Sequence, residues 1–586
     1  MGAHVVHLAV IAGLQPALQV RAVGFQVETA DADVLEAELA PPDLYVLGEF
    51  VVIVRGIMHA GRESGAGVGI ILPDLAPGAE FPRPNAHMNP HPHDSLPTAL
   101  YSAAQVRDLD ARIIAAGTPG FELMQRAAHA AWRAVRRRWP DAGEVTVLAG
   151  HGNNAGDGYL IAALAQRAGW AVRVLVVGDA SRLAGDAASA HTEAQAAGVV
   201  VLPWSDDCEL RGVLVDALLG TGLGGAVREP YAGAIARVNA SGLPVLAVDI
   251  PSGLSADTGE ILGVAVRAQL TVTFIGLKLG LFTAHGPDCS GELVFADLEA
   301  DPTLLPTSPL ATRLAPSSLG RLAPRPKAAH KGLYGHLLVI GGDSGMGGAA
   351  LLAGESALRC GAGLVSLATR EQHVASALAR RPELMAHGVV SSSDLLRLAQ
   401  RADVLVVGPG IGRNAWGRCL VSAAASLDKT QVWDADALNL LAEEAVTRPA
   451  QSWVITPHPA EAARLLGRST AEVQADRPAA ARELATRYQA VVVLKGVGSL
   501  IAAPDGRLAL CSHGHPAMAG AGLGDVLSGM IGALLAQKME TFEAACLAVW
   551  LHARAGESLG GAGRGLAASD LIPAVRQLLE ELNPCL

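Results

Sequence analysis

The chain has 586 residues, of which 50% are apolar and 17% are charged, and its formal net charge is −11. This length exceeds one ordinary hydrophobic core and predicts several domains. The acidic balance, with Lys278 as the first lysine, argues against nucleic acid or an anionic membrane as a partner. No run of 18 uninterrupted apolar residues occurs, so no membrane span is expected.

The seven cysteines are scattered and form no C-x-x-C pair. This spacing disfavours a zinc site and predicts reduced thiols in a cytoplasmic protein. Residues 1–20 are fairly apolar, but no Lys or Arg precedes them and Gln15, Pro16 and Gln19 interrupt them. A signal peptide is therefore not expected.

Residues 1–95 contain two strand-like runs, 44–54 and 67–72, and end in the Pro- and His-rich stretch FPRPNAHMNPHPHDSLP. No functional motif occurs in this segment. Two interpretations remain open. Either Met88 is the true start and 1–87 is an extension added in error, or the segment is a small accessory domain or a mobile arm.

Residues 96–300 alternate helical and strand patterns, beginning with helices expected at 102–116 and 120–138. Such alternation predicts a parallel sheet covered on both faces, with ligands at the carboxyl ends of its strands. Apolar strands are expected to end at Gly150, Val177, Asp216, Asp249 and Ile275. Glycine-rich polar turns follow three of them: HGNNAGDG (151–158), DALLGTGLGG (216–225) and DIPSGLSADTG (249–259).

Residues 301–324, rich in Pro, Leu, Ser and Arg, are expected to be a linker. A second α/β unit is predicted over 325–586, with strands near 363–368, 403–407, 431–433, 452–456 and 490–494 and closing helices near 520–536, 541–559 and 568–582. The two units share no sequence period, which indicates two different domains rather than a repeat.

The three turns of the first unit bring together oxygen-bearing side chains, namely Asn154, Asp216, Asp249 and Ser252. Oxygen ligands suit a hard cation such as K⁺, Mg²⁺ or Ca²⁺. The turns also contain six glycines that would let backbone amides approach an anion such as a pyrophosphate: 156, 158, 220, 222, 224 and 225. The plainer alternative is that Asn153 and Asn154 cap the following helix and that Asp249 merely ends a strand.

Four motifs in order, GNNAGDG, DALLGTGLGG, VDIPSGLSADTG and TVTFIGLKLGL, resemble the NAD(P)H-hydrate epimerase domain, a Rossmann-like three-layer α/β fold. The upstream LYSAAQVRDLDARIIAAGTPGFELMQRAA resembles that family's opening helices, so the likeness spans about 97–300. The family's usual turn is GNNGGDG, and Ala155 replaces a glycine. A methyl group fits there only if the local φ is negative.

The resemblance implies a potassium ion on Asn154, Asp216 and Ser252. It also implies substrate contacts at Asn153, Asn154, Ala155, Gly156, Asp157, Gly220, Thr221, Gly222, Leu223, Gly224, Gly225, Ala226 and Asp249. Inverting C6 of a hydrated nicotinamide ring needs a group that gives and takes protons, and we predict Asp249 for this role, with Asp157 as the runner-up.

In the second unit, Gly522-Leu523-Gly524-Asp525 precedes an apolar helix pattern. A helix N-terminus stabilises phosphate oxygens, and a carboxylate at Asp525 would accept a proton from a hydroxyl attacking that phosphate. The alternative is an ordinary glycine-rich turn with the aspartate as a helix cap.

Further motifs of this unit resemble the ADP-dependent NAD(P)H-hydrate dehydratase domain, which has the ribokinase-like fold, over about 325–580. They are KGLYGHLLVIGGDSGMGGAALLAGESALRCGAGLVSLAT, VVGPGIGRN, WDADALNLL, ITPHPAEAARLLG and LKGVGSLI. The resemblance implies substrate contacts at Ala350, Gly410, His458 and Asp525, and AMP-moiety contacts at Lys495, Gly496, Val497, Gly498, Ser499 and Gly524. Mg²⁺ is expected to accompany the nucleotide, although no ligand set is assigned. Leu523 stands where relatives often have Thr, and we expect the backbone amides to suffice.

We therefore predict a bifunctional repair enzyme with NADHX, NADPHX and ADP as small-molecule partners, acting as a homo-oligomer. It would interconvert the R and S hydrates and dehydrate the S form with ADP, releasing AMP and phosphate. Water leaves poorly, so phosphorylating the hydroxyl first makes the elimination feasible. Two alternatives are a ribokinase-like small-molecule kinase joined to a regulatory domain, and a first unit that only binds. Lys278 is expected either to reach a phosphate or to have a surface or packing role.

Overall fold

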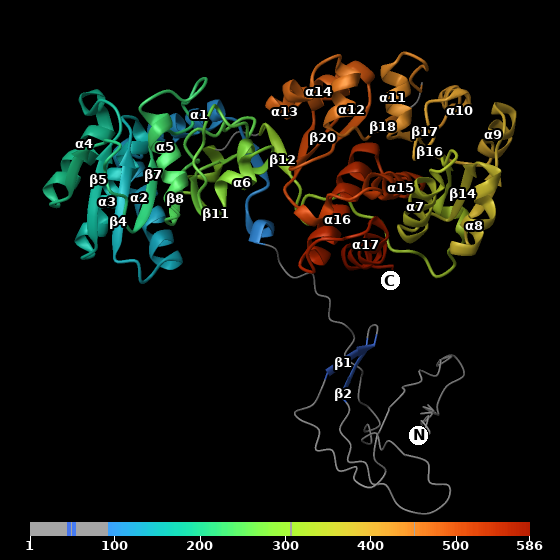
Figure 1. Cartoon of the computed structure of the whole chain (residues 1–586), viewed down its shortest axis with the longest axis horizontal. Coiled ribbons are helices and arrows are strands. Elements are labelled where there is room, and N and C mark those ends of the chain that lie inside the picture. The colour runs from blue at the N-terminus through green and yellow to red at the C-terminus, as the bar shows by residue number, and fades with distance from the viewer. Residues whose placement is uncertain (1–43, 48–49, 54–91, 305–307, 450–451, 586) are drawn as a thin grey trace, which may run out of the picture. The chain divides into compact units, whose positions relative to one another are not determined.

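The computed structural model describes residues 44–47, 50–53, 92–304, 308–449 and 452–585 (Figure 1). The chain divides into two compact units, 1–86 and 87–586. In the first, β1 (Leu44–Leu47) pairs antiparallel with β2 (Phe50–Ile53), within the strand-like run expected there. The run expected at 67–72 and the alternative start at Met88 lie outside the described residues.

The second unit contains two sheets, and the first of them is seven-stranded and parallel throughout, in the order β11-β9-β8-β7-β4-β5-β6. Its strands are β4 (Glu144–Ala149), β5 (Ala171–Val176), β6 (Val200–Pro203), β7 (Val213–Ala217), β8 (Val245–Val248), β9 (Leu270–Phe274) and β11 (Glu292–Ala296). The predicted parallel sheet, covered on both faces, is confirmed here.

Alternation along β4 explains the two cores of this sheet. Val145, Val147 and Ala149 pack with α2 (Gly120–Arg138), α3 (Asn153–Arg167) and α4 (Gly185–Ala196), whereas Leu148 faces the other side with α5 (Tyr231–Ala240). Two further helices, α1 (Ala103–Ala115) and the short α6 (Gly286–Ser290), complete this half.

The second sheet has twelve strands in the order β10-β3-β12-β21-β20-β19-β18-β17-β16-β13-β14-β15. Its main part consists of β13 (His336–Ile340), β14 (Leu364–Thr369), β15 (Met385–Gly388), β16 (Val404–Val407), β17 (Thr430–Trp433), β18 (Trp453–Ile455), β19 (Val491–Leu494), β20 (Ser499–Ala502) and β21 (Leu508–Cys511). The strands from β15 to β19 are parallel, and β20 and β21 are antiparallel to their neighbours on the β19 side.

Helices cover both faces of this sheet (Figure 1). One face packs with α7 (Gly347–Arg359), α8 (Val374–Arg380), α15 (Leu523–Ala536), α16 (Thr541–Gly560) and α17 (Ala568–Leu582). The other packs with α9 (Ser392–Ala399), α10 (Ala415–Ala425), α11 (Asp436–Ala442), α12 (Pro459–Leu466), α13 (Thr470–Ala475) and α14 (Arg477–Tyr488). The α/β class predicted for both halves is confirmed.

Three short strands join the halves. β3 (Ala99–Tyr101) and β10 (Leu277–Lys278) come from the expected first domain, and β12 (Ala311–Arg313) from the expected linker. β12 pairs with β21 on one side and with β3 on the other. The connection at 301–324 is therefore not a bare linker, and the boundary drawn there stays a prediction. No helix among the described residues is long and apolar enough to cross a membrane.

Candidate active sites

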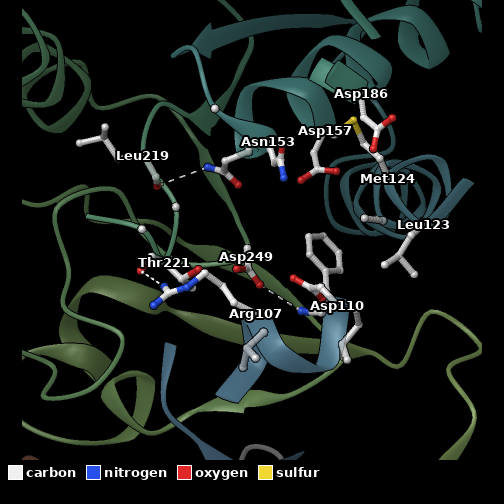
Figure 2. Close-up of a pocket in the computed structure, with 18 of the residues that line it drawn as sticks. Arg107, Asp110, Leu123, Met124, Asn153, Asp157, Asp186, Leu219, Thr221 and Asp249 are labelled. Atoms are coloured by element: carbon white, nitrogen blue, oxygen red, sulfur yellow. Dashed lines mark hydrogen bonds between the residues drawn. The ribbon is translucent and has the colours of Figure 1, made fainter. Parts of the chain in front are cut away.

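A cavity of about 530 Å³ opens at the carboxyl ends of β4, β7, β8 and β9 (Figure 2). A volume of this size accommodates a small organic ligand. Its charged and polar lining consists of Arg107, Asp110, His151, Asn153, Asn154, Asp157, Asp186, Thr221, Asp249 and Lys278.

The stretch HGNNAGDG forms the first turns of α3, directly behind β4. Asn153, Asn154 and Asp157 line the cavity, whereas Ala155 is buried in the core. Ala155 is helical and is not among the residues with positive φ. The methyl group of alanine therefore fits at this position, as the sequence analysis requires. Gly152 is the N-cap and α3 has no side-chain cap hydrogen bond, so the alternative interpretation of the two asparagines as caps is wrong.

Gly156 and Gly158 do not act as free amide donors, contrary to our expectation. Both are buried inside α3, where the helix engages its own backbone N–H groups. A Cβ on Gly156 would lie 2.5 Å from the Met124 Sδ, and one on Gly158 would lie 2.6 Å from the Ala217 Cβ. These glycines allow α3 to pack closely against α2 and β7.

Part of the second turn, DALLGTGLGG (216–225), lines the cavity. Of the seven residues expected to contact substrate there, five line the cavity: Gly220, Thr221, Gly222, Leu223 and Gly224. Gly225 and Ala226 are not among the lining residues. The Arg107 guanidinium donates to the Thr221 carbonyl at 3.3 Å, so α1 holds this turn from the opposite side.

Ser252 and Asn154 contact the backbone of Leu219, and Asp216 contacts Ser252 and the N–H of Leu218. The Asp216 carboxylate accepts from the Ser252 N–H at 2.8 Å and from the Ser252 hydroxyl at 2.6 Å. The Leu219 carbonyl accepts from the Asn154 amide at 3.3 Å and from the Ser252 hydroxyl at 3.0 Å. Burial raises the pKa of Asp216 to about 6, and the described residues offer this carboxylate no cationic partner.

Asp249 directly follows β8 and has a left-handed backbone conformation with φ 67°, which is unusual for a residue with a side chain. Its Oδ1 accepts from the Lys278 ammonium and, at 3.3 Å, from the Phe274 N–H. Lys278 is fully buried and also donates to the Thr273 hydroxyl at 3.0 Å. The surface role considered for Lys278 is therefore wrong, and the plain strand-end reading of Asp249 does not account for its ion pair.

Figure 2 shows the carboxyl groups of Asp110, Asp157 and Asp249 directed into the same space. Burial, followed by the charges of Asp249 and Asp110, raises the pKa of Asp157 well above its ordinary value. Burial also raises the pKa of Asp110 to about 6, although Lys278 opposes that rise. Sequence reasoning missed Asp110, because an acidic residue within helix α1 looks like any solvated one.

The second cluster surrounds the start of α15. Gly522 is the N-cap in a left-handed conformation (φ 86°), and Asp525 lies in the first turn of the helix. The Lys495 ammonium donates to Asp434 Oδ1 at 2.8 Å, and the Ser528 hydroxyl donates to Asp434 Oδ2 at 2.6 Å. A Cβ on Gly524 would lie 3.2 Å from the Lys495 Nζ, so helix, lysine and carboxylate are in close contact.

The charges in this cluster perturb one another. Burial, reinforced by Asp434, raises the pKa of Asp525 to about 7, although Lys495 opposes the rise. Burial raises the pKa of Glu461 to about 7 in the same way. Burial acts against the charge of Lys495, but Asp434 and Glu461 outweigh it and raise the lysine pKa. Asp434 directly follows β17, and Glu461 lies in the first turn of α12. The sequence pattern assigns no role to either residue.

His458 caps α12, and its Nδ1 accepts from the Ala460 N–H at 3.1 Å. Burial and the charge of Lys495 lower its pKa. Ala350 is fully buried in α7. Gly410 has a φ of 60° and follows Pro409, which contacts the loop after β13. The Gly342 N–H donates to the Pro409 carbonyl at 2.9 Å, so these two strand ends are joined.

Each half of the chain matches a known protein family. Residues 120–280 match the family described as YjeF-related protein N-terminus, and residues 337–575 match the NAD(P)H-hydrate dehydratase family. A bifunctional NAD(P)H-hydrate repair enzyme of Coxiella burnetii is 45% identical over 487 residues, covering 82% of this chain and 99% of the relative. The Escherichia coli enzyme of the same name is 43% identical, over 78% of this chain and 89% of the relative.

The chain belongs to the bifunctional NAD(P)H-hydrate repair enzyme family. The resemblance predicted from the motifs is thereby confirmed for both halves. Among solved structures, the second half is similar to an ADP/ATP-dependent NAD(P)H-hydrate dehydratase of Bacillus subtilis co-crystallised with ATP and Mg²⁺. That chain is 30% identical, and the match covers 45% of this chain and 95% of that one at a TM-score of 0.41.

Proposed function

We propose that this repair enzyme interconverts the R and S forms of hydrated NADH and NADPH in its first half and dehydrates the S form in its second, with ADP as phosphoryl donor. The observation that carries the proposal is the grouping of ionisable residues at both sheets. Lys278 and three carboxyl groups surround the first cavity, and Lys495 lies with Asp434, Glu461 and Asp525 beside a helix N-terminus.

For epimerisation we assign Asp249 and Asp157 to opposite proton-transfer roles. C6 carries both a hydroxyl and the ring nitrogen, so a protonated acid helps the hydroxyl leave as water while the nitrogen lone pair forms a planar C=N⁺. Water then adds to the other face as a base removes its proton. Asp249, paired with Lys278, supports the base role, and Asp157, with its raised pKa, supports the acid role.

Residues Asn153 to Asp157, Gly220 to Ala226 and Asp249 are proposed to hold this substrate, with direct contact best supported for those that line the cavity. Potassium is proposed at Asn154, Asp216 and Ser252. An all-oxygen donor set and a buried carboxylate with no cationic partner in the described part of the chain fit a hard monovalent cation. When bound, that ion would supply positive charge to the site, which would favour an anionic substrate.

For dehydration we assign Asp525 as the base that accepts the hydroxyl proton while the β-phosphoryl group of ADP moves to the hydroxyl oxygen and AMP leaves. Phosphate then departs from C6, and loss of a C5 proton restores the C5=C6 double bond. The amides of Gly522 to Gly524 at the start of α15 support stabilisation of the transferred charge. Ala350, Gly410 and His458 are proposed substrate contacts, and Lys495 to Ser499 with Gly524 are proposed to hold the AMP moiety.

Mg²⁺ is proposed to accompany the nucleotide. No group of three or more His, Cys, Asp or Glu side chains able to hold a metal occurs among the described residues. This fits an ion bound mainly through phosphate oxygens and water, whose positive charge would offset that of the phosphates.

We also propose a cytoplasmic location and self-association. All seven cysteines are free of disulfide bonds, which supports a reducing compartment. The edge strand β6 exposes Val200 and Leu202, which supports contact with a second copy. Sedimentation of the full chain would test the oligomeric state.

The test of the proposed function uses mixed R and S NADHX with ADP and follows the absorbance of reduced cofactor. Full recovery supports both activities, and no recovery would overturn the repair proposal. Asp249→Asn should stop fast recovery near half, leaving only spontaneous epimerisation, whereas Asp525→Asn should abolish it. Fast complete recovery by Asp249→Asn would show that another group is the base.

A further inference from the structure

The loop Lys495–Ser499 is held in place by a residue of the first half of the chain. Thr283 is fully buried, and its hydroxyl donates to the Val497 carbonyl at 3.2 Å, with the Gly498 carbonyl as a second acceptor at 3.4 Å. The same oxygen accepts from the Arg477 Nε at 3.1 Å. One hydroxyl therefore connects the loop to a buried guanidinium.

Arg477 contacts the root of the same loop. Its guanidinium donates to the carbonyls of Leu494 at 3.3 Å and Lys495 at 3.2 Å, and to the Gln474 side chain at 2.8 Å. Only 1% of the residue is exposed, and burial lowers its pKa to about 10. Within the described residues its hydrogen-bond partners are all neutral oxygens. A buried charge held in this way is costly unless every donor is engaged.

These contacts leave little space for a side chain at the two glycines of the loop. Gly496 has φ 129°, and a Cβ there would lie 3.0 Å from an Arg477 terminal nitrogen. Gly498 has φ 63°, and its Cβ would lie 2.1 Å from the Phe282 carbonyl oxygen and 2.7 Å from the Thr283 Cα. Close approach of the first half therefore demands glycine at Gly498, independently of any nucleotide. Val497 between them is 56% exposed.

We propose that Thr283 and Arg477 are positioning residues for the nucleotide loop, so that the first half of the chain completes the nucleotide site of the second. The proposal rests on the assignment of Lys495–Ser499 to the AMP moiety. A loop fixed before binding loses less conformational freedom when ADP arrives. Asp434, Asp525 and Ser528 lie outside these contacts, so loosening the loop should weaken ADP binding more than it slows the chemical step.

The experiment compares full-length wild type with Thr283→Val, which removes the hydroxyl at nearly constant volume, and Thr283→Ser, which keeps it. In dehydration of pure S-NADHX we expect Thr283→Val to raise the KM for ADP about tenfold, which corresponds to about 1.4 kcal/mol. Its kcat and its KM for S-NADHX should stay within about twofold of wild type, and Thr283→Ser should behave as wild type. Titration calorimetry with ADP alone should show the same order of affinities.

An unchanged ADP affinity in Thr283→Val would overturn the positioning role, and so would a lower kcat with an unchanged KM for ADP. A fall in Thr283→Ser equal to that in Thr283→Val would also contradict it, because packing alone would then explain both. Thermal melting of each variant shows whether it is folded. Failure of the proposed function looks different, because wild type itself would then neither bind ADP nor dehydrate the hydrate.

Discussion

Asp249 and Asp157 face one cavity from different surroundings. Lys278 donates to Asp249, whereas burial and two neighbouring carboxyl groups raise the pKa of Asp157. Two acids whose environments separate their protonation states form a donor and acceptor pair at one pH. Lys278 is therefore central to the first site, because its ammonium donates to Asp249, whereas the pKa values of Asp110 and Asp157 are raised.

Replacing Lys278 by Met should lower epimerase kcat/KM by more than about tenfold near pH 7, which corresponds to a loss of about 1.4 kcal/mol or more of transition-state stabilisation. Without the ammonium, Asp249 loses the charged donor that holds its Oδ1, so its carboxylate should be less well positioned to accept a proton. Time courses of epimerisation that start from pure R-NADHX would measure the rate. An unchanged rate at pH 7 would show that the ion pair has no catalytic role.

Dehydration should depend on the protonation of Asp525, whose pKa is raised to about 7. As a base it acts in its ionised form, so kcat/KM should fall with decreasing pH below about 7, by about tenfold per unit, and level off above. The profile should be measured with pure S-NADHX, so that epimerisation does not contribute. A rate that rises as the pH falls below 7 would contradict this assignment.

The Asp525 carboxyl group should also lower the free energy of unfolding at pH values where it is ionised. Because its folded pKa lies above the ordinary value, the folded state binds this proton more tightly than the unfolded chain, and stability is lost as the pH rises from about 4 to about 7. Asp525→Asn should therefore melt higher than wild type at pH 8, by about 2–4 °C per kcal/mol relieved. Near pH 4 the two should melt alike, and a lower melting temperature at pH 8 would contradict the prediction.

Residues at strand ends were predictable, and residues brought in by other elements were not. Asn154, Asp249 and Ser252 follow parallel strands and Asp216 lies near the end of one, and the carboxyl ends of these strands share one edge. Asp110 reaches the same cavity from α1. No local pattern reveals which helix crosses that edge, so neither Asp110 nor the pairing of Lys278 with Asp249 could be derived.

At the scale of elements, helix α3 shows how one glycine-rich turn can have two uses. The turn looks like a phosphate loop, and its asparagines and aspartate do line the cavity. Its last two glycines instead permit close packing of α3 against α2 and β7. Sequence alone does not separate these uses, because both need a residue without a side chain.

Gly158→Ala should destabilise the chain by about 1–3 kcal/mol, the usual cost of overpacking. Its new Cβ would lie 2.6 Å from the Ala217 Cβ and 3.0 Å from a Val147 methyl group, both on rigid strands. Gly348→Ala in α7 is the matched control, because nothing lies within 4 Å of its Cβ and helical alanine is favoured over glycine. Urea unfolding of both variants would test this, and equal midpoints would contradict the packing role.

Over the whole molecule, the short strands decide how the halves are joined. The helices for which bounds were predicted, at 102–116, 120–138, 520–536, 541–559 and 568–582, agree with α1, α2, α15, α16 and α17 to within a few residues, because their apolar periodicity is strong. The helices between α2 and α15 were expected only as connections between strands. β3, β10 and β12 have only two or three residues each, too few for any periodicity. Their pairing joins segments about 180 to 210 positions apart, which local pattern cannot indicate.

Cutting the chain should expose this dependence. A fragment 318–586 lacks β12 and leaves the β21 edge unpaired, whereas 308–586 keeps β12 on that edge. Because bare strand edges promote association, we expect 318–586 to aggregate more and to melt lower. Light scattering and thermal melting would compare them, and identical behaviour would show that β12 is dispensable.

The placement of β3 also bears on how the protein is made. Ala99–Tyr101 leaves the ribosome early, yet its antiparallel partner β12 follows about 210 residues later and the sheet behind β12 later still. At roughly 5–20 residues per second, β3 waits about 10–40 s for that partner. The nascent first half therefore carries an incomplete edge that β12 covers only later, and pauses in translation before β12 is made would prolong the exposure of that edge to chaperones and proteases.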